Sequence, residues 1–249
     1  MPIVTDEEGL NAGPVQIDAR DRAIPGYRAR PAGGGPFPVA LVVQEIFGVN
    51  PHIQDICRRL AKEGYYAVAP EMFVRQGDVS SLRDHTEIIR KIVSQVPDSQ
   101  VMSDLDDTVA WAAKDEAADV SRLVATGFCW GGRVIWLYAA HSTKLKAAAA
   151  WYGQIIGTVD EKRPRSALQV APQLKAPVIG LYGEKDQSIP VADVERMRDV
   201  LRTSGKTAEI EIYPEAGHAF HADYRPQYHE ASAKDAWGKM LAWFRKYAA

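Results

Sequence analysis

The sequence predicts an α/β fold in which a mostly parallel central sheet is flanked by helices on both faces. Short apolar, β-branched runs alternate with segments whose apolar residues recur at helical spacing, a pattern typical of parallel strands joined by crossover helices. Residues 38–43 form a near-continuous apolar run, as expected of a strand buried on both faces. Around Cys129, an apolar strand, a glycine-bounded turn and a helical segment follow one another directly.

The first quarter of the chain is expected to supply one edge of this sheet. Residues 15–19 and 27–30 are interpreted as a leading pair of strands, antiparallel at the edge, and the Pro/Gly-rich stretch 31–36 as a loop. Between positions 51 and 63 the apolar residues recur at helical spacing, and Gly64 ends that helix.

The remaining elements alternate in the same way. In chain order we expect a strand at 66–70, a loop at 73–79, helices at 82–93 and 99–114, a strand at 123–126, a helix at 132–140, strands at 147–151 and 178–182, a helix at 191–203, a strand at 209–213 and a helix at 227–247. Residues 155–173 form a long connection, which we expect to make a rim or lid over a site. No composition break marks a second domain, so a single domain over residues 1–249 is predicted.

Composition excludes several classes of function. The chain has 249 residues, 46% hydrophobic and 25% charged, which is typical of a globular protein with a substantial core. A formal net charge of −2 gives no reason to expect nucleic acid or an anionic membrane as partner. No apolar run approaches a membrane span, and the first residues lack the features of a signal peptide. Two cysteines do not make a disulfide framework and fit a reducing compartment, so we expect a cytoplasmic enzyme.

The stretch Gly127-Phe128-Cys129-Trp130-Gly131 matches a nucleophile elbow that carries cysteine in place of serine. In such an elbow the nucleophile sits on a strained turn, and small flanking residues allow the strand and the helix to approach each other. The N-terminus of the helix favours a thiolate and, later, an oxyanion. Cys129 is therefore the candidate nucleophile for acyl transfer through a thioester. Cys57, on the apolar face of its helix, is interpreted as a core residue.

Two further reactive side chains follow expected strands. Asp186 comes just past the strand 178–182, and His218 just past the strand 209–213. The chain order of nucleophile, acid and histidine is that of α/β-hydrolases. In such a triad the imidazole activates the thiol and the carboxylate fixes the imidazole tautomer. The neighbouring acids Glu184 and Asp193 are alternatives to Asp186, and His221 is the alternative to His218.

The segment after the strand 38–43 is the other expected part of the site. The backbone N–H groups of Ile46 and Trp130 are the natural donor pair for an oxyanion hole. Glu45 is a carboxylate at the buried end of a central strand, which is costly unless it is paired. From the residues alone, a structural ion pair and a functional role for Glu45 remain equally open.

These motifs together resemble the dienelactone hydrolase (carboxymethylenebutenolidase) family, part of the α/β-hydrolase superfamily. The resemblance runs through residues 44–48, residues 58–70, the Cys129 elbow, the segment up to Asp186 and the stretch after His218. It implies a hydrolase that opens an unsaturated lactone during catechol catabolism, with no metal or organic cofactor. It also implies a small-molecule substrate that carries a negative charge.

The resemblance assigns roles to further residues. Glu45 matches a glutamate that contacts the resting, largely protonated thiol and is released to take its proton when the substrate carboxylate binds an arginine. Arg75 matches that substrate-binding arginine, although a solvated surface arginine is the alternative. Phe47, Trp151 and Tyr152 are candidate substrate-binding residues, with the aromatic rings as walls for a flat, conjugated substrate.

The implied mechanism has two half-reactions: the Cys129 thiolate opens the lactone to a thioester, and water activated by His218 hydrolyses it. The sequence departs from the best-known members after the histidine, where Ala219 and Phe220 follow and the nearest arginine is Arg225. His221, Tyr224 and Arg225 either line a different pocket or belong to the surface. Two alternatives stay open: a general small-ester hydrolase, and a non-catalytic protein with an oxidisable thiol. The sequence is silent on oligomeric state.

Overall fold

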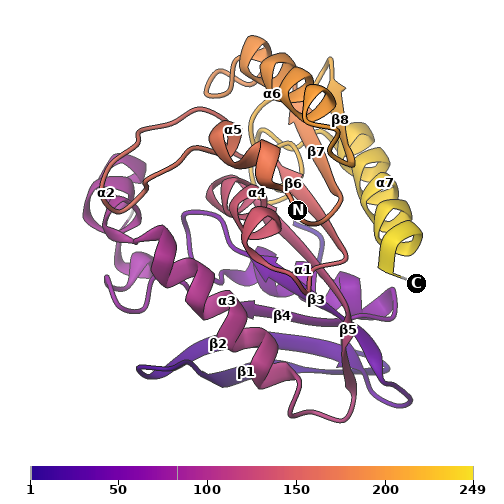
Figure 1. The fold of residues 1–249 in the computed structure, drawn as a ribbon. Coiled ribbons are helices and arrows are strands. Elements are labelled where there is room, and N and C mark those ends of the chain that lie inside the picture. The colour runs from indigo at the N-terminus through magenta and orange to yellow at the C-terminus, as the bar shows by residue number, and fades with distance from the viewer. Residues whose placement is uncertain (1, 83, 249) are drawn as a thin grey trace.

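The computed structural model describes residues 2–82 and 84–248. Within these residues, eight strands form one sheet in the order β1-β2-β4-β3-β5-β6-β7-β8 (Figure 1). The β1-β2 and β2-β4 pairs are antiparallel, and the other neighbouring pairs are parallel. The strands are β1 (Leu10–Asp18), β2 (Ala23–Pro31), β3 (Phe37–Val43), β4 (Tyr66–Pro70), β5 (Ala118–Phe128), β6 (Ala147–Trp151), β7 (Val178–Gly183) and β8 (Ala208–Tyr213). The predicted α/β fold is confirmed.

Helices cover both faces of the sheet. The longer ones are α1 (Pro51–Lys62), α3 (Asp98–Ala112), α4 (Trp130–His141), α6 (Val191–Thr203) and α7 (Glu230–Ala248), and the shorter ones are α2 (His85–Lys91) and α5 (Ala167–Val170). Helices α1 and α7 lie on one face, while α3, α4 and α6 lie on the other (Figure 1). No helix among the described residues is both long and apolar enough to cross a membrane.

The core lies between the helices and the central strands. In β3 the five residues from Val39 to Val43 are fully buried, which explains why this strand is apolar without alternation. In β6 the run of four alanines from Ala147 to Ala150 is also fully buried, between α4 and α7. Small side chains in this strand allow both helices to pack closely, so the sheet centre holds the elbow rigidly.

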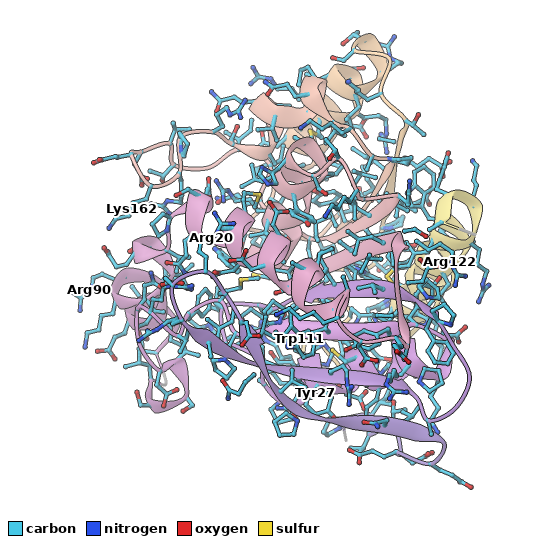
Figure 2. The ribbon with its side chains drawn as sticks, turned by 60° about the horizontal axis from the view of Figure 1, so that its bottom comes forward. Arg20, Tyr27, Arg90, Trp111, Arg122 and Lys162 are labelled. Atoms are coloured by element: carbon cyan, nitrogen blue, oxygen red, sulfur yellow. The ribbon has the colours of Figure 1, made fainter. Side chains whose placement is uncertain are left out.

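Several elements differ in length from the prediction. Strand β5 begins at Ala118 rather than at position 123, because its polar first half pairs with β3 at residues 37 and 38. Helix α2 is shorter than the predicted helix 82–93, and position 83 lies outside the described residues. Figure 2 brings the β1-β2 edge forward, with Tyr27 on β2 and Trp111 on α3 labelled.

The connection between β6 and α5 forms a rim beside α2, and it is shorter than the predicted connection 155–173 because residues 167–173 are helical. Its Lys162 backbone oxygen accepts a hydrogen bond from the Asp98 N–H at 2.8 Å, and its Lys162 ammonium donates to Gln95 at 2.5 Å. Arg90 and Lys162 consequently project on the same side of the molecule in Figure 2. This rim faces the carboxyl ends of the parallel strands, where α/β proteins bind their ligands.

Candidate active site

Cys129 lies in a strained turn between β5 and α4. Its backbone has φ 55° and ψ −113°, a conformation that costs a non-glycine residue about 1–3 kcal/mol. Side chains in place of Gly127 or Gly131 would collide with nearby backbone, which for Gly131 is that of Val43 in β3. The glycines therefore allow the close approach of β5, α4 and β3 that forces the Cys129 side chain out at the strand ends.

A chain of hydrogen bonds runs from this cysteine to a buried acid. The His218 Nε2 lies 3.2 Å from the Cys129 Sγ, and the His218 Nδ1 lies 2.7 Å from the Asp186 Oδ2. The other oxygen of Asp186 accepts hydrogen bonds from the backbone N–H groups of Ser188 and Ile189 at 2.7 and 3.2 Å. The acid is thus immobilised by its own loop, and it orients the imidazole toward the sulfur.

The electrostatics of this chain favour a charged histidine. Burial alone would lower the pKa of His218, but its hydrogen bonds to Asp186 and Cys129 raise that pKa from 6.5 to about 10. A protonated imidazole next to sulfur favours the thiolate form of the cysteine. The arrangement therefore places a cationic imidazole next to the sulfur.

The alternatives left open by the sequence occupy other environments. Glu184 is exposed, and among the described residues neither it nor Asp193 has a hydrogen bond to His218. His221 is fully buried among aromatic rings, with the Trp151 ring centroid at 4.6 Å. Burial first, and the nearby His52 second, hold the pKa of His221 well below its usual range. A neutral histidine in the core has no contact with the thiol.

Cys57 is also a core residue, as the sequence indicates. Its side chain is fully buried in α1, and burial raises the pKa of its thiol far above the ordinary value. The two cysteines of the chain thus differ sharply, because Cys129 is partly exposed and has a basic partner.

A cavity of about 500 Å³ opens in front of the Cys129 thiol. Apolar and aromatic side chains make up much of its wall, and the Cys129 thiol and the His218 imidazole are among its polar groups. The lining residues are Ile46, Phe47, His85, Ile89, Val93, Cys129, Trp130, Arg133, Tyr152, Gln154, Thr158, Arg163, Ser188, Ile189, His218, Arg225 and Gln227. This combination is typical of a small-molecule site.

Three of the expected substrate-binding and oxyanion residues line this cavity together with the thiol. Ile46 and Phe47 come from the loop after β3, and Trp130 is the first residue of α4. Among the described residues, the backbone N–H groups of Ile46 and Trp130 have no hydrogen-bond partner. Glu71 braces the loop, since its Oε2 accepts the Val49 N–H at 2.8 Å.

The two neighbouring aromatic residues at the end of β6, Trp151 and Tyr152, lie in different environments. Tyr152 lines the cavity, and its ring stands edge-on to the His218 ring with 5.2 Å between centroids. Trp151 does not reach the cavity: it is fully buried, and its Nε1 donates to the Thr126 hydroxyl at 3.0 Å. Successive residues at a strand end point to opposite faces of the sheet, so only one of the pair can face the site.

Arg75 is likewise outside the cavity, contrary to the expected substrate-binding role. Its guanidinium pairs with Asp104 at 2.7 Å and with Asp21 at 2.6 Å. These two partners lie on α3 and on the β1-β2 turn, so this arginine joins the sheet edge to a helix. The cation is already neutralised by two carboxylates and is not free for a substrate.

Arg225 lies in the cavity instead, a position that the sequence left undecided. Its guanidinium sits 5.6 Å above the Phe47 ring. Arg133 and Arg163 also line the cavity, but they are paired with Asp98 and Asp160. Among the described residues, Arg225 has no acidic partner. In the sequence, the position of Arg225 shortly after His218 was the available signal. The spacing between these two residues could not show in which direction the Arg225 side chain points.

Glu45 contacts a tyrosine and not the thiol. Its side chain is fully buried, its Oε2 accepts a hydrogen bond from the Tyr224 hydroxyl at 2.7 Å, and its Oε1 has no partner. Among the described residues it has no hydrogen bond to Cys129. The expected contact between this glutamate and the resting thiol is therefore absent, because the sulfur faces His218 instead.

No cluster of three or more His, Cys, Asp or Glu side chains suited to a metal ion occurs in the part of the chain that the structure describes. The chemistry that can be read from the site is that of its own thiol, imidazole and backbone donors.

Comparison with known proteins places this site in a family. A family model described as "Dienelactone hydrolase family" matches residues 24–248. The chain belongs to the dienelactone hydrolase family. A protein of Methylorubrum extorquens, provisionally named a carboxymethylenebutenolidase, is 57% identical over 245 residues, covering 98% of this chain and 84% of that protein. An Escherichia coli K12 protein with the same provisional name is 51% identical over 246 residues, covering 98% and 90%.

A solved structure is also similar. The crystal structure of a protein from Klebsiella pneumoniae, provisionally described as a dienelactone hydrolase, superimposes with a TM-score of 0.94 at 54% identity, covering 96% of this chain and 99% of that one. This dienelactone hydrolase family member is accordingly a carboxylic ester hydrolase with an α/β-hydrolase fold.

Proposed function

We propose that this hydrolase opens small anionic lactones, or cleaves small carboxylic esters, through a thioester on Cys129. The observation that supports this most directly is the hydrogen-bonded chain Cys129–His218–Asp186 at the end of the cavity. A sensor thiol would have no need of an acid that orients the histidine, so the chain favours catalysis over a redox role.

In the first half-reaction the Cys129 thiolate attacks the carbonyl carbon. The developing oxyanion accepts hydrogen bonds from the N–H groups of Ile46 and Trp130, which have no other partner. The C–O bond then breaks and leaves an enolate, or an alcohol after His218 gives up its proton. The product of this step is a thioester.

In the second half-reaction water attacks the thioester. By then the leaving enolate or alkoxide has taken the His218 proton, so His218 is neutral and can accept a proton from the water. Asp186 holds the imidazole in the tautomer whose Nε2 is free to act as that base. The C–S bond breaks, and the departing thiolate restores the ion pair with His218.

Arg225 is proposed to bind the carboxylate of the substrate in place of Arg75. It is a cation at the cavity wall with no acidic partner among the described residues, and its place above the Phe47 ring limits its movement. Phe47 and Tyr152 are proposed to flank the scissile group. Ile89 and Val93 also line the cavity, and these apolar side chains favour esters that carry an additional apolar group.

We also propose that the enzyme works in the cytoplasm, in the catabolism of catechols. Free thiols at Cys57 and Cys129 fit a reducing compartment. The family of the chain and its relatives, which are provisionally named carboxymethylenebutenolidases, support this pathway.

The first experiment measures ring opening of cis- and trans-dienelactone by absorbance, with wild type, Cys129→Ala and Cys57→Ala. We expect opening by wild type and by Cys57→Ala, but none by Cys129→Ala. Hydrolysis of p-nitrophenyl esters that depends on Cys129, without dienelactone opening, would keep the mechanism and move the substrate to other esters. Turnover that survives in Cys129→Ala would refute the proposal.

A further inference from the structure

Exposed apolar side chains gather around the active-site cavity. The exposed large apolar side chains in the described part of the chain are those of Ile3, Val4, Ile89, Ile156, Val159 and Tyr224. Ile89 lines the cavity, and Ile156 and Val159 bracket Thr158 in the sequence, which lines it as well. A single exposed apolar residue needs no explanation, but a group of them beside a cavity generally marks a binding site. We call Ile89, Ile156 and Val159 the apolar patch.

The segment that carries two residues of the apolar patch is fixed at both ends. At its start the Ile155 side chain is buried, and the Ile155 oxygen accepts a hydrogen bond from the Leu168 N–H at 3.1 Å. At its end the Asp160 N–H donates to the Arg163 oxygen at 3.0 Å. Because both ends of this short turn are fixed, the two side chains between them stay exposed although their burial would be favourable.

Helix α2 lies beside this connection and holds Ile89 at the cavity (Figure 1). Its Ile88 is buried, so the next residue, about 100° further around the helix, faces another side. His85 stands one turn before Ile89 on the same face, and its ring lies 5.1 Å from the Phe47 ring, between centroids. The Arg225 guanidinium sits 5.6 Å above that same Phe47 ring. A cation and an apolar wall are thus joined across one aromatic side chain.

This surface has the chemistry to bind a small amphiphile. Arg225 is a cation without an acidic partner among the described residues, and it fits a carboxylate. The apolar patch fits an alkyl or aryl group. A flat protein or lipid surface could cover the patch but would not enter the cavity where Arg225 lies. The continuity of patch and cavity therefore favours one molecule that spans both.

We propose that the apolar patch determines substrate specificity, and that the substrate is an amphiphilic ester or lactone. Its carboxylate binds Arg225, and its apolar group runs past Ile89 to Ile156 and Val159. The proposal rests on the proposed function, because it takes the cavity at Cys129 to be the substrate site. A substrate made of a small ring alone would leave the patch in water, so affinity grows with the length of the apolar group.

The test is isothermal titration calorimetry with hexanoate, octanoate and decanoate, which carry a carboxylate and an alkyl chain and need no turnover. In wild type we expect Kd to fall about two- to fourfold per added methylene group. The double variant Ile156→Ser/Val159→Ser should keep the Kd of hexanoate within about twofold and lose most of the gain from octanoate to decanoate. Arg225→Gln should raise all three Kd values about tenfold and keep the dependence on chain length.

Val4→Ser is the matched control, because it replaces an apolar side chain that is 78% exposed in another part of the molecule. The neighbouring Thr5 N–H donates to Asp55 on α1 at 2.7 Å, which fixes this segment away from the cavity. All three Kd values of this control should equal those of wild type. Circular dichroism checks the fold of each variant, and serine is tolerated well at positions that are already exposed.

Three results would overturn the proposal. The first is a wild-type Kd that does not change with chain length, and the second is a double variant with the same dependence on chain length as wild type. The third is a dimer in sedimentation velocity, or binding to phosphatidylcholine vesicles, that the double variant abolishes while it binds decanoate as tightly as wild type. If Cys129→Ala still hydrolyses p-nitrophenyl esters, the proposed function fails, whatever the titrations show.

Discussion

Replacing Asp186 by asparagine should reverse the tautomer of His218. In the protein, one oxygen of Asp186 accepts two backbone N–H groups, from Ser188 and Ile189, and the other faces the His218 Nδ1 at 2.7 Å. An asparagine keeps its oxygen for the two backbone donors and must turn its NH₂ toward the imidazole. The Nδ1 then accepts, the proton moves to Nε2, and Nε2 can no longer take the Cys129 proton.

The magnitude follows from the electrostatics of His218. A rise of its pKa from 6.5 to about 10 corresponds to about 5 kcal/mol of preference for the imidazolium, shared between its contacts to Asp186 and Cys129. Losing the anionic partner and the correct tautomer should lower kcat/KM for ester hydrolysis by about a thousandfold or more. Iodoacetamide should also alkylate Cys129 more slowly at pH 7, since the thiolate loses its charged partner.

The assay compares p-nitrophenyl acetate hydrolysis by wild type, Asp186→Asn and the control Asp193→Asn. Asp193 is a nearby acid that has no hydrogen bond to the imidazole among the described residues. We expect wild-type rates from the control. An Asp186→Asn enzyme that stays within about threefold of wild type would refute the argument, because the tautomer would then not matter.

The same change predicts a pH-dependent difference in stability. Because the pKa of His218 is raised in the folded state, its stabilising contribution is complete below pH 6.5 and is lost as the pH rises toward about 10. The free energy of unfolding of wild type should therefore exceed that of Asp186→Asn by more at pH 6 than at pH 10. Urea titrations at both pH values measure this difference, and an equal difference at both would contradict the linkage.

Three further predictions follow from the cavity and the elbow. Arg225→Gln should raise KM about ten- to hundredfold for esters that carry a carboxylate and should have little effect on neutral esters. The control Arg202→Gln, at an exposed arginine, should leave KM unchanged for both substrate types. Equal losses on both substrate types in Arg225→Gln would exclude a carboxylate contact. Ile89→Asn should lower kcat/KM about fivefold for p-nitrophenyl butyrate but not for p-nitrophenyl acetate, because the longer acyl chain has more apolar surface to bury against Ile89. An equal loss of kcat/KM on both esters would argue against a contact between the acyl chain and Ile89. Gly131→Ala should lower the melting temperature by at least about 5 °C, because a side chain there collides with backbone. The control Gly238→Ala, in open space on α7, should leave the melting temperature unchanged or higher. An unaltered melting temperature in Gly131→Ala would show that the elbow can relax.

Local patterns of residues were enough to predict most of the scaffold. The apolar run of β3 and the helical spacing of α1 act through neighbours in sequence, and the glycines around Cys129 belong to a short recognisable motif, so the chain itself reports them. The lengths of β1, β2 and β5 were underestimated. The missed parts are strands because a partner strand supplies the hydrogen bonds, and pairing between distant segments leaves no local signal.

The site shows the same division. Cys129, Asp186 and His218 were identified from the sequence because each must follow a parallel strand, and the carboxyl ends of those strands meet at one edge of the sheet. Only the tertiary structure decided which arginine lines the cavity without an acidic partner among the described residues. Arg75 is neutralised by two acids from distant elements, while Arg225 is brought to the cavity by the turn after β8.

By itself, the sequence determined the order of the main elements, the elbow and the candidate nucleophile, because strand pattern, turn residues and side-chain chemistry are properties of short segments. The tertiary structure alone decided which charges are paired, that Tyr224 holds Glu45, and that Trp151 is buried while Tyr152 lines the cavity. The physical reason is that electrostatic compensation and burial depend on groups far apart in the chain, and only the folded state brings them within contact distance.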